Sequence, residues 1–340
     1  MNFIARSLLL ASLLTGCAAE PIEAPPPPVD LAHPPARPAV SVGGTTRWFV
    51  VDSYRLGVTD RNGAMTAAGW KQYGYDLDGR ATSREDSRDG KGACRRPAGA
   101  PTMGQQDGVG GIDNNFGQHF VPVVKTLMYD VEKLTNERVA NGGYTLVLRI
   151  DDVSGASEDA YAPGALYFVG HRDKPKFTAD EKWPVAGTKI EPIATFPAGY
   201  VSGGTWVSGD LGAELKQVAL PFLGDALLAP LFGGVLTLGL DSRQGTMAGA
   251  VRTTDFLEAM KPSLVRRGVC PGTATYDQYI STVTQSSDML ATLPLAVDPS
   301  RTCDAVSLGV GFTVAPIAGV AGTTGAPEPP ESVECKKESS

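Results

Sequence analysis

The chain has only three histidines, and no two of them are close in sequence. His33 lies in a proline-rich segment, whereas His119 and His171 are candidate general bases. The motif H-E-x-x-H is missing, as are G-x-S-x-G, the Walker A loop and a complete G-x-G-x-x-G. These absences exclude the enzyme families with the strongest sequence signatures. A surface or capping role is the more common explanation of an isolated histidine.

Dense clusters of basic residues are missing as well. Thirty Lys and Arg stand against 37 Asp and Glu in the 340 residues, which gives a net charge of −7. A protein that binds along a phosphate backbone needs a basic surface, so the composition argues against nucleic acid as a partner.

Long hydrophobic runs are also missing. An apolar stretch at residues 7–14 is too short to cross a bilayer of about 30 Å as a helix. It follows Arg6 and has the length of the apolar core of an export signal. We therefore predict that residues 1–16 are a signal peptide.

The signal ends in Leu14-Thr15-Gly16-Cys17, which resembles the lipobox of bacterial lipoproteins. The resemblance implies that Cys17 carries a diacylglyceryl group and an amide-linked acyl chain such as palmitate, and becomes the mature N-terminus. Several acyl chains anchor a protein stably where one does not. Ala18 in place of Asp implies sorting to the outer membrane. The alternative is an ordinary secretory signal with a chance cysteine.

Low-complexity segments flank one candidate domain. Residues 17–44 are rich in proline and poor in large apolar residues, so they are predicted to be a semi-rigid tether. Residues 319–340 have a similar composition and are predicted to be a disordered tail. Residues 45–318 contain no comparable linker or repeat, which favours a single domain.

Short apolar runs bounded by Gly, Pro or Asp predict β-strands throughout this domain. The predicted strands cover residues 48–51, 144–150, 165–169, 204–207, 214–220, 234–240, 246–252 and 305–314. An apolar period of three to four residues predicts a helix over about 117–139, and less regular patterns predict helices over about 276–293 and from Asp255. The predicted fold is mainly β, an antiparallel β-sandwich of the jelly-roll or lectin kind with two or three peripheral α-helices.

Four cysteines remain once Cys17 is set aside: Cys94, Cys270, Cys303 and Cys335. An even number in an exported protein predicts two disulfides, with three connectivities open. We expect Cys270 to pair with Cys303, because the two flank a predicted helix, and Cys94 to pair with Cys335. A zinc site is the weaker alternative, since no C-x-x-C or histidine pair is present.

Aspartate and glycine are concentrated between residues 74 and 117. Carboxylates spaced two apart and followed by Gly are what a hard cation requires, so Asp76, Asp78, Asp107 and Asp113 are candidate Ca²⁺ ligands. Aligned as an EF-hand-like loop, the segment would use Glu85 at its last position, but its first position is Gly74. Asp, Asn and Gly are also good turn formers, and this simpler explanation stays open. Asn114 or Asn115 is a candidate N-cap for the helix that follows.

Three segments form a combination that resembles a known family. They are D-L-D-G-R at 76–80, G-I-D-N-N-F-G at 111–117, with a cysteine between these two, and the later segment 303–312. This pattern resembles an uncharacterised family of predicted bacterial surface lipoproteins. The resemblance implies a location at the cell envelope and carries no activity or active site.

Two functions from different classes fit these observations. The first is a non-enzymatic binding or structural lipoprotein, Ca²⁺-stabilised, with a glycan or a surface protein as partner. The second is an envelope hydrolase that acts on glycan or peptide polymers through two carboxylates. Of the four tryptophans, Trp183 is the one we expect to be exposed to sugars.

Overall fold

The computed structural model describes residues 31–100, 102, 104–128, 130–210, 215–222, 225–325 and Cys335. The predicted signal peptide, Cys17 and the first part of the predicted tether lie outside these residues, so lipidation stays a prediction. Within the described ranges, no helix combines the length and the apolar character that crossing a membrane requires.

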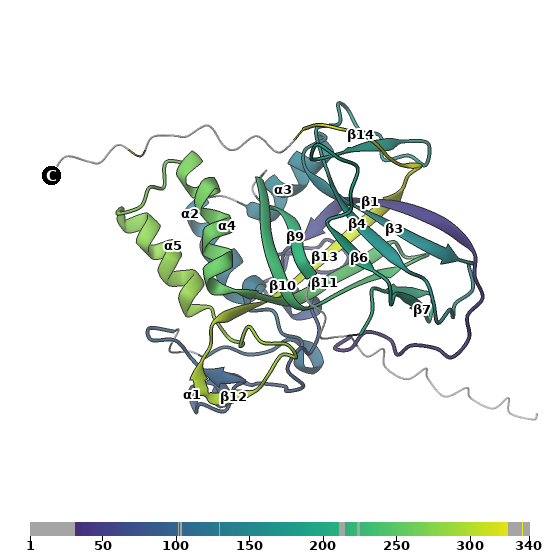
Figure 1. The fold of residues 1–340 in the computed structure, drawn as a ribbon. Coiled ribbons are helices and arrows are strands. Elements are labelled where there is room, and N and C mark those ends of the chain that lie inside the picture. The colour runs from purple at the N-terminus through teal and green to yellow at the C-terminus, as the bar shows by residue number, and fades with distance from the viewer. Residues whose placement is uncertain are drawn as a thin grey trace, which may run out of the picture. The chain divides into compact units, whose positions relative to one another are not determined.

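Twelve strands form one large, mostly antiparallel sheet (Figure 1). Its order is β14-β5-β4-β3-β1-β13-β11-β10-β8-β7, with β6 beside β4 and β9 beside β10. Each of the eight predicted strands is present: β1 (Thr45–Arg55), β3 (Thr145–Val153), β4 (Gly164–Val169), β8 (Thr205–Val207), β9 (Leu215–Phe222), β10 (Asp225–Gly239), β11 (Gln244–Arg252) and β13 (Ala305–Pro316). The mainly-β prediction is confirmed, and the arrangement is consistent with a β-sandwich.

The strands that the sequence pattern did not predict are short or atypical in composition. They are β5 (Lys182–Val185), β6 (Ala194–Phe196), β7 (Tyr200–Ser202) and β14 (Gly319–Thr323), together with a separate parallel pair formed by β2 (Cys94–Arg95) and β12 (Asp298–Thr302). Segments of two to five residues are too short to display an alternating pattern, and β12 has no alternating apolar positions.

Apolar residues of the sheet pack on both of its faces. On β1, Phe49 and Val51 belong to the main core, whereas Val50 points to a second apolar layer on the opposite face. Trp206 of β8 packs in the main core against Phe196, with ring centroids 5.6 Å apart. Trp183 lies in the second layer and is completely buried, so the expectation that it is exposed was wrong.

Five α-helices lie around the sheet in the described part of the chain: α1 (Arg84–Arg88), α2 (Val121–Met128), α3 (Val131–Ala140), α4 (Thr253–Arg266) and α5 (Ala274–Gln285). Short 3₁₀ turns occupy Gly69–Gln72 and Val109–Gly111, and a π-helical turn occupies Phe116–Phe120. The single helix expected over 117–139 is divided, because Asp130 caps the start of α3 by accepting a hydrogen bond from the Lys133 N–H. Helices α4 and α5 run side by side (Figure 1).

The domain begins before the predicted boundary at residue 45. Residues 31–44, which we call the N-terminal strap, were assigned to the tether, but they pack on the domain. Ala32 is buried, the Arg37 guanidinium donates to the carbonyls of Ala160 and Ala198, and the Tyr200 hydroxyl donates to the Pro35 carbonyl. A proline-rich segment can therefore pack on a domain when donors of the domain reach its backbone carbonyls.

Asp159 holds the end of this strap and supports a first prediction. Its fully buried carboxylate accepts hydrogen bonds from the N–H groups of Val42, Gly43 and Tyr161 at 3.1–3.3 Å. We expect Asp159→Ala to lower the free energy of unfolding by about 2–4 kcal/mol, because three donors lose their acceptor. Urea denaturation measures this loss. Asp173→Ala is the control, since Asp173 is exposed, and an equal loss in both variants would contradict the assignment.

The prediction of two disulfides is confirmed, but the expected pairing was wrong. Cys94 pairs with Cys303, and Cys270 pairs with Cys335. The parallel pairing of β2 with β12 explains the first bond, because the Cys303 N–H donates to the carbonyl of Arg95, next to Cys94. The C-terminal segment is also partly ordered, since β14 pairs with β5 and Cys335 is bonded to the domain.

Candidate functional site: an acidic cavity

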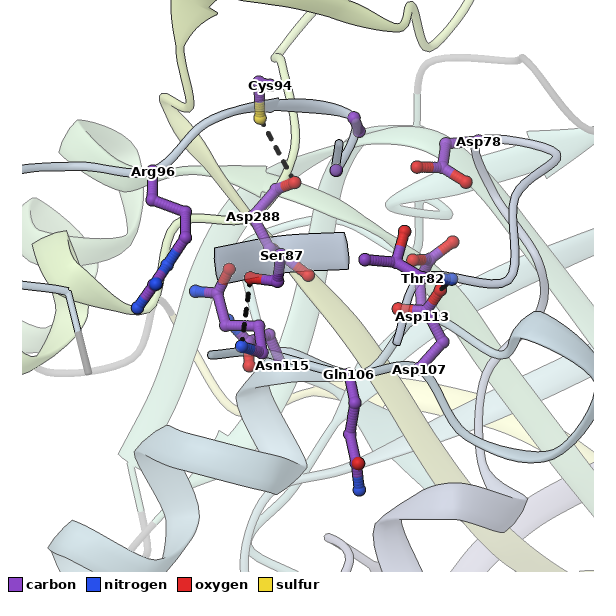
Figure 2. Close-up of a pocket in the computed structure, with 13 residues that line it drawn as sticks. Asp78, Thr82, Ser87, Cys94, Arg96, Gln106, Asp107, Asp113, Asn115 and Asp288 are labelled. Carbon is purple, nitrogen blue, oxygen red and sulfur yellow. Dashed lines mark hydrogen bonds between the residues drawn. The ribbon is translucent and has the colours of Figure 1, made fainter. Parts of the chain in front are cut away.

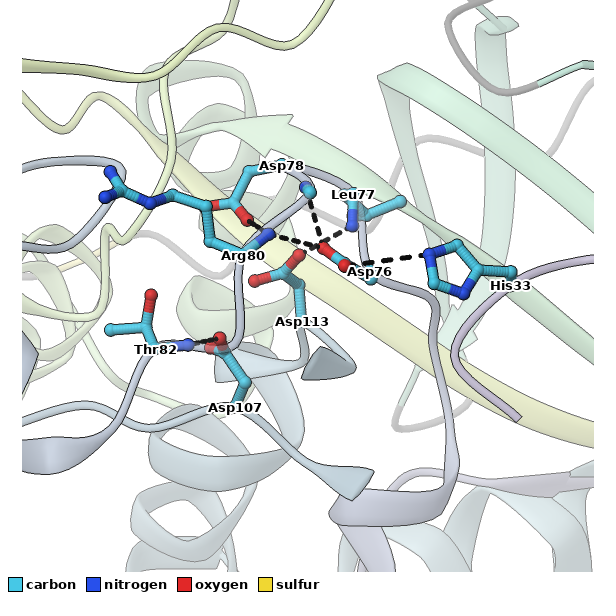
Figure 3. Close-up of polar contacts among 9 residues, drawn as sticks. His33, Asp76, Leu77, Asp78, Arg80, Thr82, Asp107 and Asp113 are labelled. Atoms are coloured by element: carbon cyan, nitrogen blue, oxygen red, sulfur yellow. Dashed lines mark hydrogen bonds and ion pairs between the residues drawn. The ribbon is translucent and has the colours of Figure 1, made fainter. Parts of the chain in front are cut away.

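Four aspartates predicted from sequence come together at one place. Asp76, Asp78 and Asp113 each present a carboxylate oxygen such that the three oxygens lie within 4.8 Å of one another. Asp107 lies beside this triad (Figure 3), although it is separated from Asp78 by an entire loop and by α1. The arrangement brings together residues that are up to 37 positions apart in sequence.

Backbone N–H groups hold each of these carboxylates in place. Asp76 accepts from the N–H of Gly79 at 2.7 Å and of Arg80 at 3.0 Å, and Asp78 also accepts from Arg80. Gly79 has a φ of 75°, a conformation that glycine adopts without strain and that closes this turn. The Leu77 N–H donates to Asp113, which ties the two loops together.

Asp107 is held in the same manner, because it accepts a short hydrogen bond from the Thr82 N–H. His33 of the N-terminal strap lies 3.7 Å from Asp76, and the Asp76 N–H donates to the Ala32 carbonyl. The strap therefore covers one side of the aspartate cluster (Figure 3).

A small cavity of about 20 Å³ lies against the cluster (Figure 2). This volume accepts about one water molecule or one ion. Asp78, Asp107 and Asp113 line it together with two residues that the sequence did not single out as ligands, Asp288 and Asn115. The sulfur of Cys94 lies 3.2 Å from the Asp288 carbonyl oxygen, which places the Cys94–Cys303 disulfide at the wall of the cavity.

The side-chain oxygen of Asn115 is an acceptor that receives no hydrogen bond from the described residues. Its Nδ2 donates to the Ser286 carbonyl, whereas its Oδ1 has no hydrogen-bond partner among the described residues. The residue is only 3% exposed. Capping of the following helical turn is performed by its neighbour Asn114, whose Oδ1 accepts from the Gly117 N–H. A buried amide oxygen without a partner is costly, and it marks a position that a donor or a cation would satisfy.

Burial raises the pKa of the carboxyl groups that face the cavity. The pKa is raised to about 6 for Asp78, to about 8 for Asp107 and to about 7 for Asp288, and it lies well above the ordinary value for Asp113. Loss of hydration is the largest cause in each case, and repulsion between neighbouring carboxylates adds to it. Without a cation, the cavity therefore retains protons at neutral pH.

The loop is not an EF-hand. Glu85, expected at the last position of such a loop, lies on α1 and is exposed. It is not part of the group of oxygens that lie within reach of one ion. Asn115 is two positions after the predicted Asp113 in the sequence, whereas Asp288 had no detectable signal, because it follows α5 in an ordinary Ser-Ser-Asp sequence.

The histidine and tryptophan candidates lie apart from this arrangement. Burial, assisted by Arg84 and Arg96, lowers the pKa of His119 to about 4, so its imidazole is neutral at physiological pH. His171 packs edge-on against Tyr144. Trp70, Trp183 and Trp206 are buried, and only Trp48 is half-exposed. Neither histidine lines the acidic cavity in the part of the chain that the structure describes.

No protein-family model, curated protein or solved structure matches this chain. The resemblance to surface lipoproteins stays a prediction from the sequence.

Proposed function

We propose that this chain is a lipid-anchored protein of the outer membrane with a non-enzymatic, binding or structural role, and that a calcium ion stabilises its loop region. The export signal and the Cys17 lipobox support the anchor. The small acidic cavity supports the cation, and it is the observation that carries the proposal.

The oxygen atoms that line the cavity, together with the neighbouring carboxylate of Asp76, fit a hard cation. Calcium binds six to eight oxygens at about 2.3–2.6 Å, so ligands on opposite sides of the ion are about 5 Å apart. Asp76, Asp78 and Asp113 satisfy this limit. Asn115 Oδ1 adds an unpartnered neutral oxygen at the cavity, and Asp107 adds a further carboxylate. Clustered buried carboxylates repel one another, and a divalent ion removes that cost.

The same geometry favours a structural role for the cluster over a hydrolase. A site for a small ligand has a volume of roughly 300–1,000 Å³, and a polymer needs an open groove. The acidic cavity holds only about 20 Å³, which is too small for either. The aspartate carboxylates of the cluster accept hydrogen bonds from backbone N–H groups of the surrounding loops. Carboxylates bonded in this way stabilise the conformation of the loops.

Calcium titration calorimetry on the soluble chain from Ala18 onward tests the proposal. We expect saturation near one ion per chain and a melting temperature that is higher in calcium than in EDTA. At a calcium concentration 100 times Kd the stabilisation is about 2.7 kcal/mol, or roughly 4 °C for a domain of this size. Asp113→Asn retains an acceptor for the Leu77 N–H and should weaken calcium binding at least tenfold.

Asp89→Asn is the matched control, because Asp89 lies on the same acidic segment, is exposed and does not line the cavity. It should bind calcium like the unmodified chain. A flat titration together with identical melting in EDTA would reduce the aspartates to turn formers and leave the cation proposal without support.

A further inference from the structure

A second, larger cavity lies at the ends of strands β1 and β13, beside the turn between β10 and β11. Its volume is about 520 Å³, which is the size of a site for a small ligand. Trp48, Arg47, Asp241 and Arg243 line it, together with Thr46 and the segment 316–318. It shares no lining residue with the acidic cavity.

Trp48 is held rigidly at this cavity. Its ring packs against Tyr167 with centroids 5.5 Å apart, and the Arg149 guanidinium lies 5.8 Å from its centre. Arg149 is fixed in turn by an ion pair with Asp151 at 3.1 Å. The Trp48 carbonyl accepts from the Ile317 N–H, which joins β1 to the end of β13. An aromatic ring fixed at a cavity provides a flat apolar surface at little entropic cost.

Two arginines at the cavity have no ion-pair partner. Among the described residues, neither Arg47 nor Arg243 has a carboxylate within 4.0 Å, although the chain as a whole is acidic. Arg243 has a φ of 57°, which is uncommon for a residue other than glycine. Hydrogen bonds hold its backbone there: its N–H donates to Gly239 and its carbonyl accepts from Val314.

These groups together match the chemistry of one ligand class. A guanidinium binds a carboxylate through two parallel hydrogen bonds, a carboxylate such as Asp241 accepts from hydroxyl groups, and an aromatic ring covers the apolar face of a sugar. We propose that the Trp48 cavity binds an acidic saccharide, that is, a sugar residue bearing a carboxylate. This inference deepens the binding role proposed above, and it does not depend on the cation.

Tryptophan fluorescence of the soluble chain from Ala18 onward tests this site, because the other three tryptophans are buried. The probe is a tetramer of galacturonic acid, compared with the neutral galactose tetramer of the same linkage. We expect a saturable signal with the acidic tetramer and at least tenfold weaker binding of the neutral one. Arg243→Gln and Arg47→Gln should each weaken binding at least tenfold, and Arg301→Gln, an exposed arginine on β12, should not.

The variant Trp48→Phe distinguishes the fluorescence change from binding of the acidic tetramer. This variant keeps an aromatic ring, so calorimetry should still detect the acidic tetramer while the fluorescence change is lost. The proposal is overturned by equal binding of the two tetramers, by binding that survives both arginine substitutions, or by no binding of either. Inorganic sulfate that competes as strongly as the tetramer would also overturn it, since the site would then bind simple anions.

Each measurement is made in calcium and in EDTA at a temperature where the chain stays folded in both. Saccharide binding without any calcium response would remove the cation from the proposed function and leave the Trp48 site intact. A calcium response without saccharide binding would overturn the Trp48 site and leave the proposed cation site intact.

Discussion

Removing the Cys94–Cys303 disulfide is expected to lower the free energy of unfolding by about 3–5 kcal/mol. The bond joins residues that are 209 positions apart, so it restricts the unfolded chain strongly. Both cysteines are buried beside Ala93 and Leu290, and their loss also weakens the wall of the acidic cavity. The double variant Cys94→Ala/Cys303→Ala, compared with the unmodified chain by urea denaturation, measures the effect.

The second disulfide provides the comparison. Cys270 and Cys335 are separated by 65 positions, and Cys270 is only half-buried. We expect Cys270→Ala/Cys335→Ala to cost less stability and to leave calcium binding unchanged. If the two double variants lost equal stability, and neither changed calcium binding, the link between the first disulfide and the cavity would be wrong.

In the absence of a cation, the domain is expected to become less stable by about 3 kcal/mol or more as the pH rises from 5 to 8.5. Carboxyl groups with a raised pKa bind more protons in the folded chain than in the unfolded chain. Their contribution to stability is therefore complete below pH 4 and is lost as the pH passes through the folded-state values, which are about 7 for Asp288 and about 8 for Asp107.

Melting curves in EDTA at several pH values measure this loss. Asp107→Asn retains an acceptor for the Thr82 N–H but cannot ionise, so it should flatten the decline with pH, whereas Asp89→Asn should leave it unchanged. Calcium should restore more stability at pH 8.5 than at pH 5, because the ion competes with protons for the same oxygens. Stability that rose with pH in EDTA would contradict the buried state of these carboxyl groups.

Strand prediction succeeded where the physical signal was local. Residues such as those of β3 and β13 alternate or form apolar runs long enough to be recognised, and those runs became central strands of the sheet. Trp183 shows the limit of local reasoning. Charged and proline neighbours suggested exposure, but the pairing of β5 with β4 and β14 placed its ring in the second apolar layer.

The disulfide pairing and the extent of the domain required the tertiary structure. Proximity in sequence suggested that Cys270 pairs with Cys303, whereas the parallel pairing of β2 with β12 brings Cys94 to Cys303. Similarly, the composition of the N-terminal strap indicated a solvated tether. Its docking depends on the buried carboxylate of Asp159, 116 residues beyond Gly43, and no local pattern records that interaction.

The sequence by itself predicted an export signal and determined the residue types of the acidic segment and the mainly-β class, because each of these depends on neighbouring residues along the chain. It also identified four aspartates that the fold brings together. The tertiary structure alone decided that Asp288 and Asn115 join them around a small cavity, and that Arg243 lies at one cavity with Arg47 and Trp48. Such sites combine residues from distant strands and loops, and their proximity follows from how the sheet packs.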